Sequence, residues 1–128
     1  MPVQLNHTIV NALDPEASAR SLAELLGLAA PHRFGPFMVV ELANGVSLDY
    51  IVATKDELIV EHYAFLVDES EFDAIFGRIR ARGLPYWADP AKRTANEINH
   101  HDGGRGVYWN DANGHMLEII TRPYGSGG

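Results

Sequence analysis

The sequence predicts an α+β protein that contains two copies of one unit, each with a strand, a helix and further strands. One segment occurs twice: residues 43–51 read Ala-Asn-Gly-Val-Ser-Leu-Asp-Tyr-Ile, and residues 112–120 read Ala-Asn-Gly-His-Met-Leu-Glu-Ile-Ile. Each copy places an acid four residues after its glycine, Asp49 in the first and Glu118 in the second. A duplicated segment that carries a metal-ligand residue type at the same place constrains fold and function together.

The first unit begins with a strand predicted over residues 3–10, which carries His7. Asp14 then predicts the start of a helix, because its side chain can accept hydrogen bonds from the free backbone N–H groups of the first turn. Gly27 predicts the end of that helix, since glycine readily adopts the left-handed conformation that follows a helix.

Two further strands are predicted over residues 37–42 and 46–52. They are joined through Asn44-Gly45, a favoured pair for a tight hairpin turn. A short fourth strand is expected before residue 60. The unit is therefore β-α-β-β, with one more strand possible.

The second unit repeats this order, beginning with a strand over residues 62–67 that starts at His62. Asp68 and Glu71 have the spacing of a capping box at the start of a helix. Apolar residues then recur at helical spacing and predict one buried face: Phe72, Ile75, Phe76 and Ile79. Gly83 predicts the end of this helix.

A short strand over 84–87 and a closing hairpin of 107–110 with 115–121 complete the second unit. The polar segment 89–105 has no equivalent in the first unit, so we expect a long loop there. Loops of this length in a compact domain are more often functional than idle. The tail, residues 122–128, has the composition of a flexible end, in which Arg122 and Tyr124 could fold back over a binding site or fray.

Composition limits the protein's class. With 128 residues, 46% hydrophobic and 21% charged, the chain is expected to be one globular domain, residues 1–128. The formal charge of −7 argues against nucleic-acid binding. Having no cysteine, the protein has no disulfide, thiolate-bound metal or cysteine nucleophile. No leader and no apolar run of about 20 residues is visible, so we expect a cytoplasmic protein that does not bind membranes.

Three motifs in order, Leu-Asn-His at 5–7, His-Tyr-Ala-Phe at 62–65 and Asn-Gly-His-x-Leu-Glu at 113–118, carry a resemblance. In these the chain resembles the vicinal oxygen chelate superfamily, the group of glyoxalases, bleomycin-resistance proteins and extradiol dioxygenases. The resemblance implies two βαβββ modules, about residues 3–58 and 59–122, whose sheets curl into a cleft around one divalent metal, usually in a homodimer. It also implies that His7, His62 and Glu118 are the metal ligands.

The chemistry of these residues supports that ligand set. Imidazole and carboxylate groups suit Fe(II), Mn(II), Ni(II) or Zn(II). Strand periodicity places Met116, Glu118 and Ile120 on one face of their strand, where an acid among apolar side chains is costly without a partner. One histidine alone is more often a hydrogen-bonded core residue. The three residues together, in a repeated context, indicate a metal site.

Asp49 divides the candidate reactions. Metal sites of the glyoxalase I branch use a fourth protein ligand at this position, commonly Glu, and Asp is one methylene shorter. If Asp49 does not bind the metal, two histidines and one carboxylate form the facial triad of non-haem Fe(II) oxygenases. If Asp49 binds, the site resembles glyoxalases, in which a metal polarises a substrate oxygen.

The fosfomycin-transferase branch shares the Asn-His and His-Tyr-Ala-Phe motifs. In that branch a threonine stands two residues after the first histidine, whereas this chain has Ile9. The basic residues that hold a phosphonate in that branch are not evident here, since Lys92, Arg93 and Arg105 lie in an unaligned loop. This activity is disfavoured.

His101 and Tyr108 are the candidate catalytic residues. His101 belongs to the Asn-His-His-Asp run of the long loop and could supply an acid or base. Alternatively, His101 is a solvent-exposed loop residue with no role in catalysis. Tyr108 is one of several aromatics that could line a pocket for a flat substrate, although aromatics at alternating strand positions are more often core.

We therefore expect an Fe(II)-dependent oxygenase, with Mn, Ni or Zn as other possible metals. Its substrate would be a phenolic or quinoid small molecule that chelates the metal through vicinal oxygens, and dioxygen would be the second substrate. The first alternative is a glyoxalase-type lyase or isomerase that uses no oxygen. The second is a metal-free protein that sequesters an aromatic drug, as in the bleomycin-resistance branch.

Overall fold

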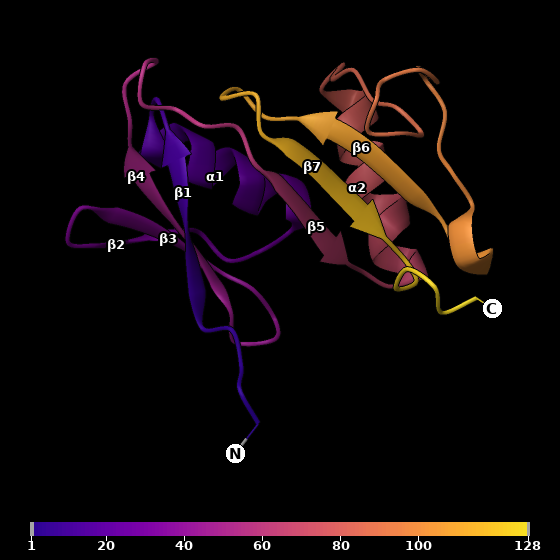
Figure 1. The fold of residues 1–128 in the computed structure, drawn as a ribbon, viewed down its shortest axis with the longest axis horizontal. Coiled ribbons are helices and arrows are strands. Elements are labelled where there is room, and N and C mark those ends of the chain that lie inside the picture. Colours follow the sequence, from indigo (N-terminus) through magenta and orange to yellow (C-terminus); the bar gives the residue numbers. More distant parts are fainter. Residues whose placement is uncertain (1, 128) are drawn as a thin grey trace. The chain divides into compact units, whose positions relative to one another are not determined.

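The computed structural model describes residues 2–127, which form two compact units that divide after Ile59. The first unit contains β1 (His7–Ala12), α1 (Pro15–Leu26), β2 (His32–Phe34), β3 (Phe37–Glu41) and β4 (Ser47–Val52). The second contains β5 (His62–Leu66), α2 (Glu69–Ala81), the 3₁₀ turn η1 (His101–Gly103), β6 (Gly106–Asn110) and β7 (Met116–Ile120) (Figure 1). The predicted α+β class with paired βαβββ modules is confirmed.

The sheet of the first unit has the strand order β1-β4-β3-β2, with β1 parallel to β4 and the other pairs antiparallel. α1 packs against β1, β3 and β4. Val10, Tyr50 and Met38 are aligned across these three strands, and all three are buried. Because strand side chains alternate between faces, the residues between them lie on the face away from α1.

The sheet of the second unit has the order β5-β7-β6, with β5 parallel to β7. α2 runs along one face of this sheet (Figure 1). The core of the unit consists of fully or nearly fully buried residues from α2 and the strands: Phe72, Ile75, Ile79, Val107, Trp109, Leu117 and Ile119. This burial confirms the predicted apolar face of the helix, apart from Phe76, which is half-buried.

Both helices begin where the sequence predicts. The Asp14 side chain accepts a hydrogen bond from the backbone N–H of Ala17 at 3.1 Å. Asp68 accepts from the N–H of Glu71 at 2.7 Å, and the Glu71 carboxylate accepts from the N–H of Asp68 at 3.0 Å, a complete capping box. Gly27 ends α1 in the left-handed conformation, with φ 72°.

The first strand is displaced from its predicted position. β1 begins at His7 and runs to Ala12, whereas residues 3–10 were expected, because the ladder with β4 starts at the pair His7 and Ser47. The apolar side chain of Val3 therefore lies before the strand and is fully exposed.

The additional strand of the first unit is β2, not a segment before residue 60. Gly35, at φ 57°, allows the tight turn through which β2 pairs with β3. Residues 54–57 form a turn, in which Thr54 and Glu57 exchange side-chain to backbone hydrogen bonds of 2.9 and 3.3 Å.

The strand predicted over 84–87 shrinks to one bridging residue. Trp87 pairs with Tyr108 on one side and with Ala95 on the other. Pro85 has no N–H to donate to a ladder, which limits any longer pairing. The loop that follows is held in place by the Asn99 amide, which donates to the carbonyl of Ala88 at 2.9 Å.

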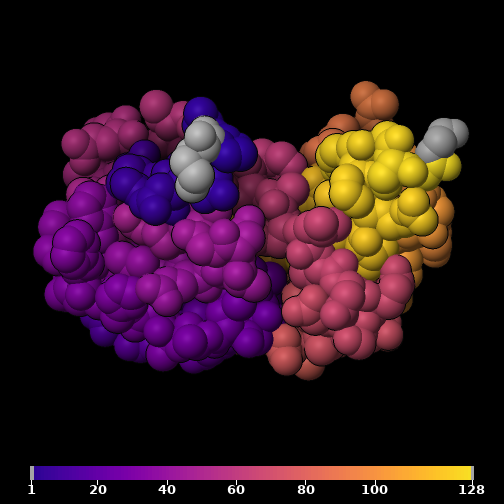
Figure 2. All heavy atoms as spheres, turned by 90° about the horizontal axis from the view of Figure 1, so that it is seen from below, coloured from indigo at the N-terminus to yellow at the C-terminus, as the bar shows by residue number. Residues whose placement is uncertain are grey.

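The C-terminal tail is anchored rather than frayed, the first of the two alternatives that the sequence left open. Arg122 donates to the Ser126 carbonyl at 3.2 Å, and the N–H of Gly127 donates to the Asp102 carboxylate at 3.3 Å. Figure 2 shows this segment, in yellow, on the surface of the second unit. Among residues 2–127, no helix has both the length and the apolar character needed to cross a bilayer.

Replacing Ile79 by Ala should destabilise the second unit by about 2–5 kcal/mol, because a fully buried side chain leaves a cavity. Urea unfolding followed by tryptophan fluorescence would measure this change. The control is Leu66→Ala, at a strand position that is 61% exposed, where a loss below about 1 kcal/mol is expected. Equal losses in the two variants would contradict the assigned core.

Asp68→Ala should lower the melting temperature, and this effect should depend on pH. The hydrogen bond from the Glu71 N–H, followed by that from Ser70, lowers the pKa of Asp68 below 3.8. The capping contribution is therefore complete above that unfolded-state value and is lost as the pH falls through the lower folded-state value. Melting curves from pH 7 to pH 2 should show the two proteins converging, and a constant difference would contradict the assignment.

Candidate metal centre

His62 and Glu118 lie together on the face of the second sheet that α2 does not cover. In the parallel register of β5 and β7, His62 is paired with Met116, and Ala64 with Glu118. The two side chains therefore point to the same face. The His62 Nε2 atom lies 3.0 Å from Oε1 of Glu118. The Glu118 side chain is fully buried, whereas that of His62 is 47% exposed.

The hydrogen bonds of His62 determine which ring nitrogen is free. Nδ1 lies 3.1 Å from the backbone carbonyl oxygen of Met116, which can only accept a hydrogen bond, so Nδ1 carries the proton. In a neutral ring, Nε2 then presents its lone pair toward the Glu118 carboxylate, which is also an acceptor when ionised. Two acceptors at 3.0 Å require a cation between or beside them, either a proton or a metal ion.

The separation of these two donors suits a metal ion. Bonds of about 2.1 Å from a metal to an imidazole nitrogen and to a carboxylate oxygen, at a right angle, place the two donors about 3.0 Å apart. The structure shows this separation between Nε2 and Oε1. A carbonyl that fixes the second nitrogen is the usual support of a metal-bound histidine. The donor set therefore fits a divalent metal of the iron, manganese, nickel and zinc group.

Two tyrosines complete the surroundings of Glu118. Tyr108, the neighbour of Glu118 across β6 and β7, places its hydroxyl 2.9 Å from that of Tyr124. The Tyr124 hydroxyl donates a hydrogen bond to Oε2 of Glu118. Burial raises the pKa of both phenols, and the hydrogen bond to the Glu118 carboxylate raises that of Tyr124 further. Both hydroxyls therefore keep their protons and can act as donors.

Tyr124 was not among the predicted site residues, because the sequence left open whether it folds back over the site or frays. Its tail is rich in glycine and serine, a composition typical of a flexible end, and the sequence pattern carries no sign of the return to β7. The only available signal was one aromatic residue in that tail, six positions after Glu118.

The first unit repeats the arrangement with a shorter acid. In the ladder of β1 and β4, His7 is paired with Ser47, and Ile9 with Asp49, as His62 and Ala64 are with Met116 and Glu118. His7 is exposed, and its Nδ1 lies 2.8 Å from the Asn6 side-chain oxygen.

Asp49 is buried and accepts a hydrogen bond of 2.7 Å from the Ser47 hydroxyl. Within residues 2–127, no hydrogen bond joins His7 to Asp49, in contrast to the pair of the second unit. Neither unit alone, over the same residues, gathers three or more His, Asp or Glu side chains around one point.

His101 lies apart from these contacts. It opens η1 as an exposed residue, and its backbone N–H donates to the Asn99 side chain at 3.3 Å. No hydrogen bond or ion pair among the described residues connects its ring to His62 or Glu118. Of the two predicted catalytic residues, the structure thus brings Tyr108 to the carboxylate, and His101 stays a prediction.

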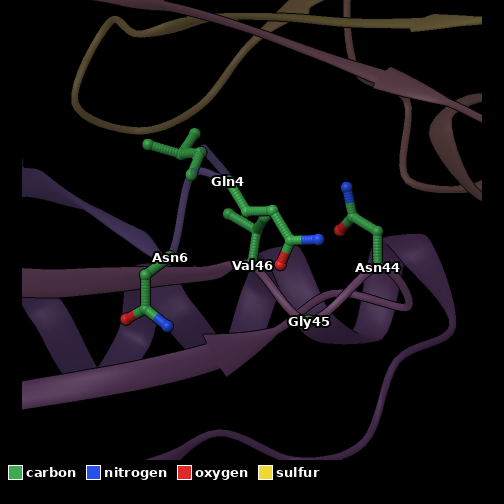
Figure 3. Close-up of a pocket in the computed structure, with 6 residues that line it drawn as sticks. Gln4, Asn6, Asn44, Gly45 and Val46 are labelled. Atoms are coloured by element: carbon green, nitrogen blue, oxygen red, sulfur yellow. The ribbon is translucent and has the colours of Figure 1, made fainter. Parts of the chain in front are cut away.

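The first unit also contains a cavity of about 470 Å³ beside the start of β1 (Figure 3). Its lining is uncharged: Gln4, Leu5, Asn6, Asn44, Gly45 and Val46. In the second unit, the residue equivalent to Val46 is His115, which is fully buried and accepts a hydrogen bond of 3.0 Å from the Glu61 N–H.

Comparisons with known proteins agree with this architecture. The chain is 64% identical to a solved structure named Oxidase ChaP-H1, covering 97% of this chain and 99% of that one, with a TM-score of 0.94. It is 62% identical to Oxidase ChaP-H2 over the full length of both chains, with a TM-score of 0.96. The glutathione transferase FosA of Serratia marcescens is 29% identical over 120 residues, which are 90% of this chain and 78% of that protein.

More distant solved structures, 16–22% identical, carry the names glyoxalase, bleomycin-resistance protein and lactoylglutathione lyase, and these show the fold alone. No family model matches the chain. The two βαβββ units, the ordered histidine and glutamate motifs and these relatives together show that the chain belongs to the vicinal oxygen chelate superfamily.

Proposed function

We propose that this protein is a metal-dependent oxygenase that acts on a phenolic or quinoid small molecule, with Fe(II) as its metal. The observation that carries the proposal is the 3.0 Å contact between Nε2 of His62 and the buried carboxylate of Glu118. The relatives of 62–64% identity are named oxidases, which supports oxygen chemistry. The proposal includes a homodimer in the cytoplasm.

His62 and Glu118 would supply two ligands, and His7 would supply the third. His7 is proposed because it holds in its unit the position that His62 holds in the second. When bound, a redox-active metal with two histidines and one carboxylate on one face can accept a chelating substrate and dioxygen at its remaining positions. The second ring nitrogen of His62 keeps the ring oriented through the Met116 carbonyl.

Tyr108 would donate a hydrogen bond to the substrate in place of the one that its hydroxyl gives to Tyr124, whose own proton is donated to Glu118. The Tyr108 hydroxyl belongs to the face that carries Glu118, and its raised pKa keeps the phenol protonated at neutral pH. A protonated phenol can stabilise negative charge that develops on a substrate oxygen. His101 is proposed as a proton-transfer group from the long loop, since imidazole is the commonest side chain in that role.

A glyoxalase-type lyase or isomerase is the second candidate. Asp49 favours it, because this buried acid occupies the first-unit position equivalent to Glu118 and could serve as a fourth ligand. Its hydrogen bond from Ser47 and its shorter side chain favour a position away from the metal. A metal-free drug-binding protein is the third candidate.

The similarity to FosA introduces a phosphonate-directed transferase as a further comparison. Ile9 argues against it, because this apolar, partly exposed side chain lies on the same face of β1 as His7. A tetrahedral anion would require a donor at such a position. This activity is therefore not proposed.

Anaerobic purification with Fe(II) should give about one iron per chain, and Glu118→Ala should weaken metal binding more than about 100-fold, beyond the loss typical of outer supporting groups. Elemental analysis after dialysis measures both. The matched control is Glu97→Ala, which removes an exposed acid of the long loop and should retain the metal.

Asp49→Ala distinguishes the two enzyme classes in the same assay. Retention of iron in this variant agrees with the three-ligand site, whereas loss of metal would favour the glyoxalase-type site. A wild-type protein that binds no metal would contradict both enzymes and leave the binding protein.

The iron-loaded protein should consume dioxygen in the presence of a catechol or hydroquinone substrate, and Tyr108→Phe should lower kcat about 100-fold, as expected for loss of a proton-donating group. An oxygen electrode with product analysis measures this. The control is Tyr86→Phe, which removes a phenol whose ring packs against Phe76 in the same unit. Product formation at an unchanged rate under argon would instead identify the lyase or isomerase.

A further inference from the structure

We infer that Tyr124 is a positioning residue that restricts Glu118 to binding the metal through one carboxylate oxygen. The inference rests on the proposed metal site and goes further, since it assigns a role to the C-terminal tail. It concerns only the second unit, in which Glu118, Tyr108 and Tyr124 all lie.

The two oxygens of the Glu118 carboxylate contact different partners. Oε1 faces Nε2 of His62 at 3.0 Å, the side on which the metal would bind. Oε2 accepts the hydrogen bond from the Tyr124 hydroxyl. Because Glu118 is fully buried, water does not supply an alternative donor to that oxygen.

The tail holds the Tyr124 ring by bonds on both sides of it. Arg122 donates to Ser126, and the Gly127 N–H donates to the side chain of Asp102 in η1. The Tyr124 residue is 58% exposed although its hydroxyl reaches a buried acid. An exposed aromatic ring with an inward hydroxyl contributes little to the core, so its main contact is with the carboxylate and Tyr108.

This restriction matters for the number of free positions at the metal. An octahedral ion with three protein donors has about three positions left, enough for two substrate oxygens and one dioxygen. A carboxylate that binds through both oxygens would occupy one of the three. The Tyr124 hydroxyl therefore keeps open the position that an oxygenase with a chelating substrate needs.

The test is to measure bound water in the Mn²⁺-loaded protein by water-proton relaxation, for wild type and Tyr124→Phe. Phenylalanine keeps the ring and removes only the hydroxyl that bonds to Oε2. Release of Oε2 to the metal should displace one of about three bound waters, so the relaxation enhancement should fall by about one third. Tyr86→Phe is the matched control and should leave it unchanged.

Each other outcome overturns the inference in a distinguishable way. Full Mn²⁺ binding with unchanged relaxation in Tyr124→Phe would show that the hydroxyl does not limit the carboxylate. A tenfold gain in Mn²⁺ affinity with unchanged relaxation would show that the phenol competes with the metal. A wild-type protein that binds no Mn²⁺ and no iron would overturn the proposed function, and this inference with it.

Discussion

The second unit is organised around a buried carboxylate that faces an imidazole. Glu118 needs compensation for its burial. The Tyr124 hydroxyl supplies it at one oxygen, and the other oxygen faces Nε2 of His62, where a proton or a metal ion would supply it. The parallel register of β5 and β7 sets the distance between carboxylate and imidazole, and the carbonyl of Met116 sets the orientation of the ring. A slip of one residue in that register would turn Glu118 into the apolar core under α2. The register of the strand pair therefore also determines the geometry of the two proposed ligands.

The two units share this strand pairing but differ in the residues at the equivalent positions. At the position of Glu118 the first unit has Asp49, and at that of Met116 it has Ser47, whose hydroxyl bonds to the aspartate. In the second unit, Glu118 therefore faces the histidine of the neighbouring strand. In the first unit, Asp49 instead accepts a hydrogen bond from Ser47 of its own strand. Two copies of one fold thus offer unequal donor sets, as expected where only one acid completes a site with open positions.

The parts of the fold that depend on neighbouring residues were predictable from sequence. The capping aspartates, the helix stop at Gly27 and the hairpin through Asn44-Gly45 act within a few residues, and each lies where it was predicted. β2 was missed because its pairing depends on the turn at Gly35 rather than on an alternating pattern. Tyr124 was not assigned to the site because its partner, Glu118, is set by the folding of the tail and by no local signal. The pair of His62 and Glu118 could be predicted because both residues lie at positions that are repeated in the first unit, as His7 and Asp49.

The anchored tail has a practical consequence for work with the protein. The N–H of Gly127, three residues after Tyr124, is bonded to the side chain of Asp102. An affinity tag fused directly after residues 122–127 would disturb the segment that holds the phenol against Glu118. Such a fusion could fold normally and still report an altered metal stoichiometry or oxygen uptake. The position of a tag is therefore an experimental variable for the proposed metal site.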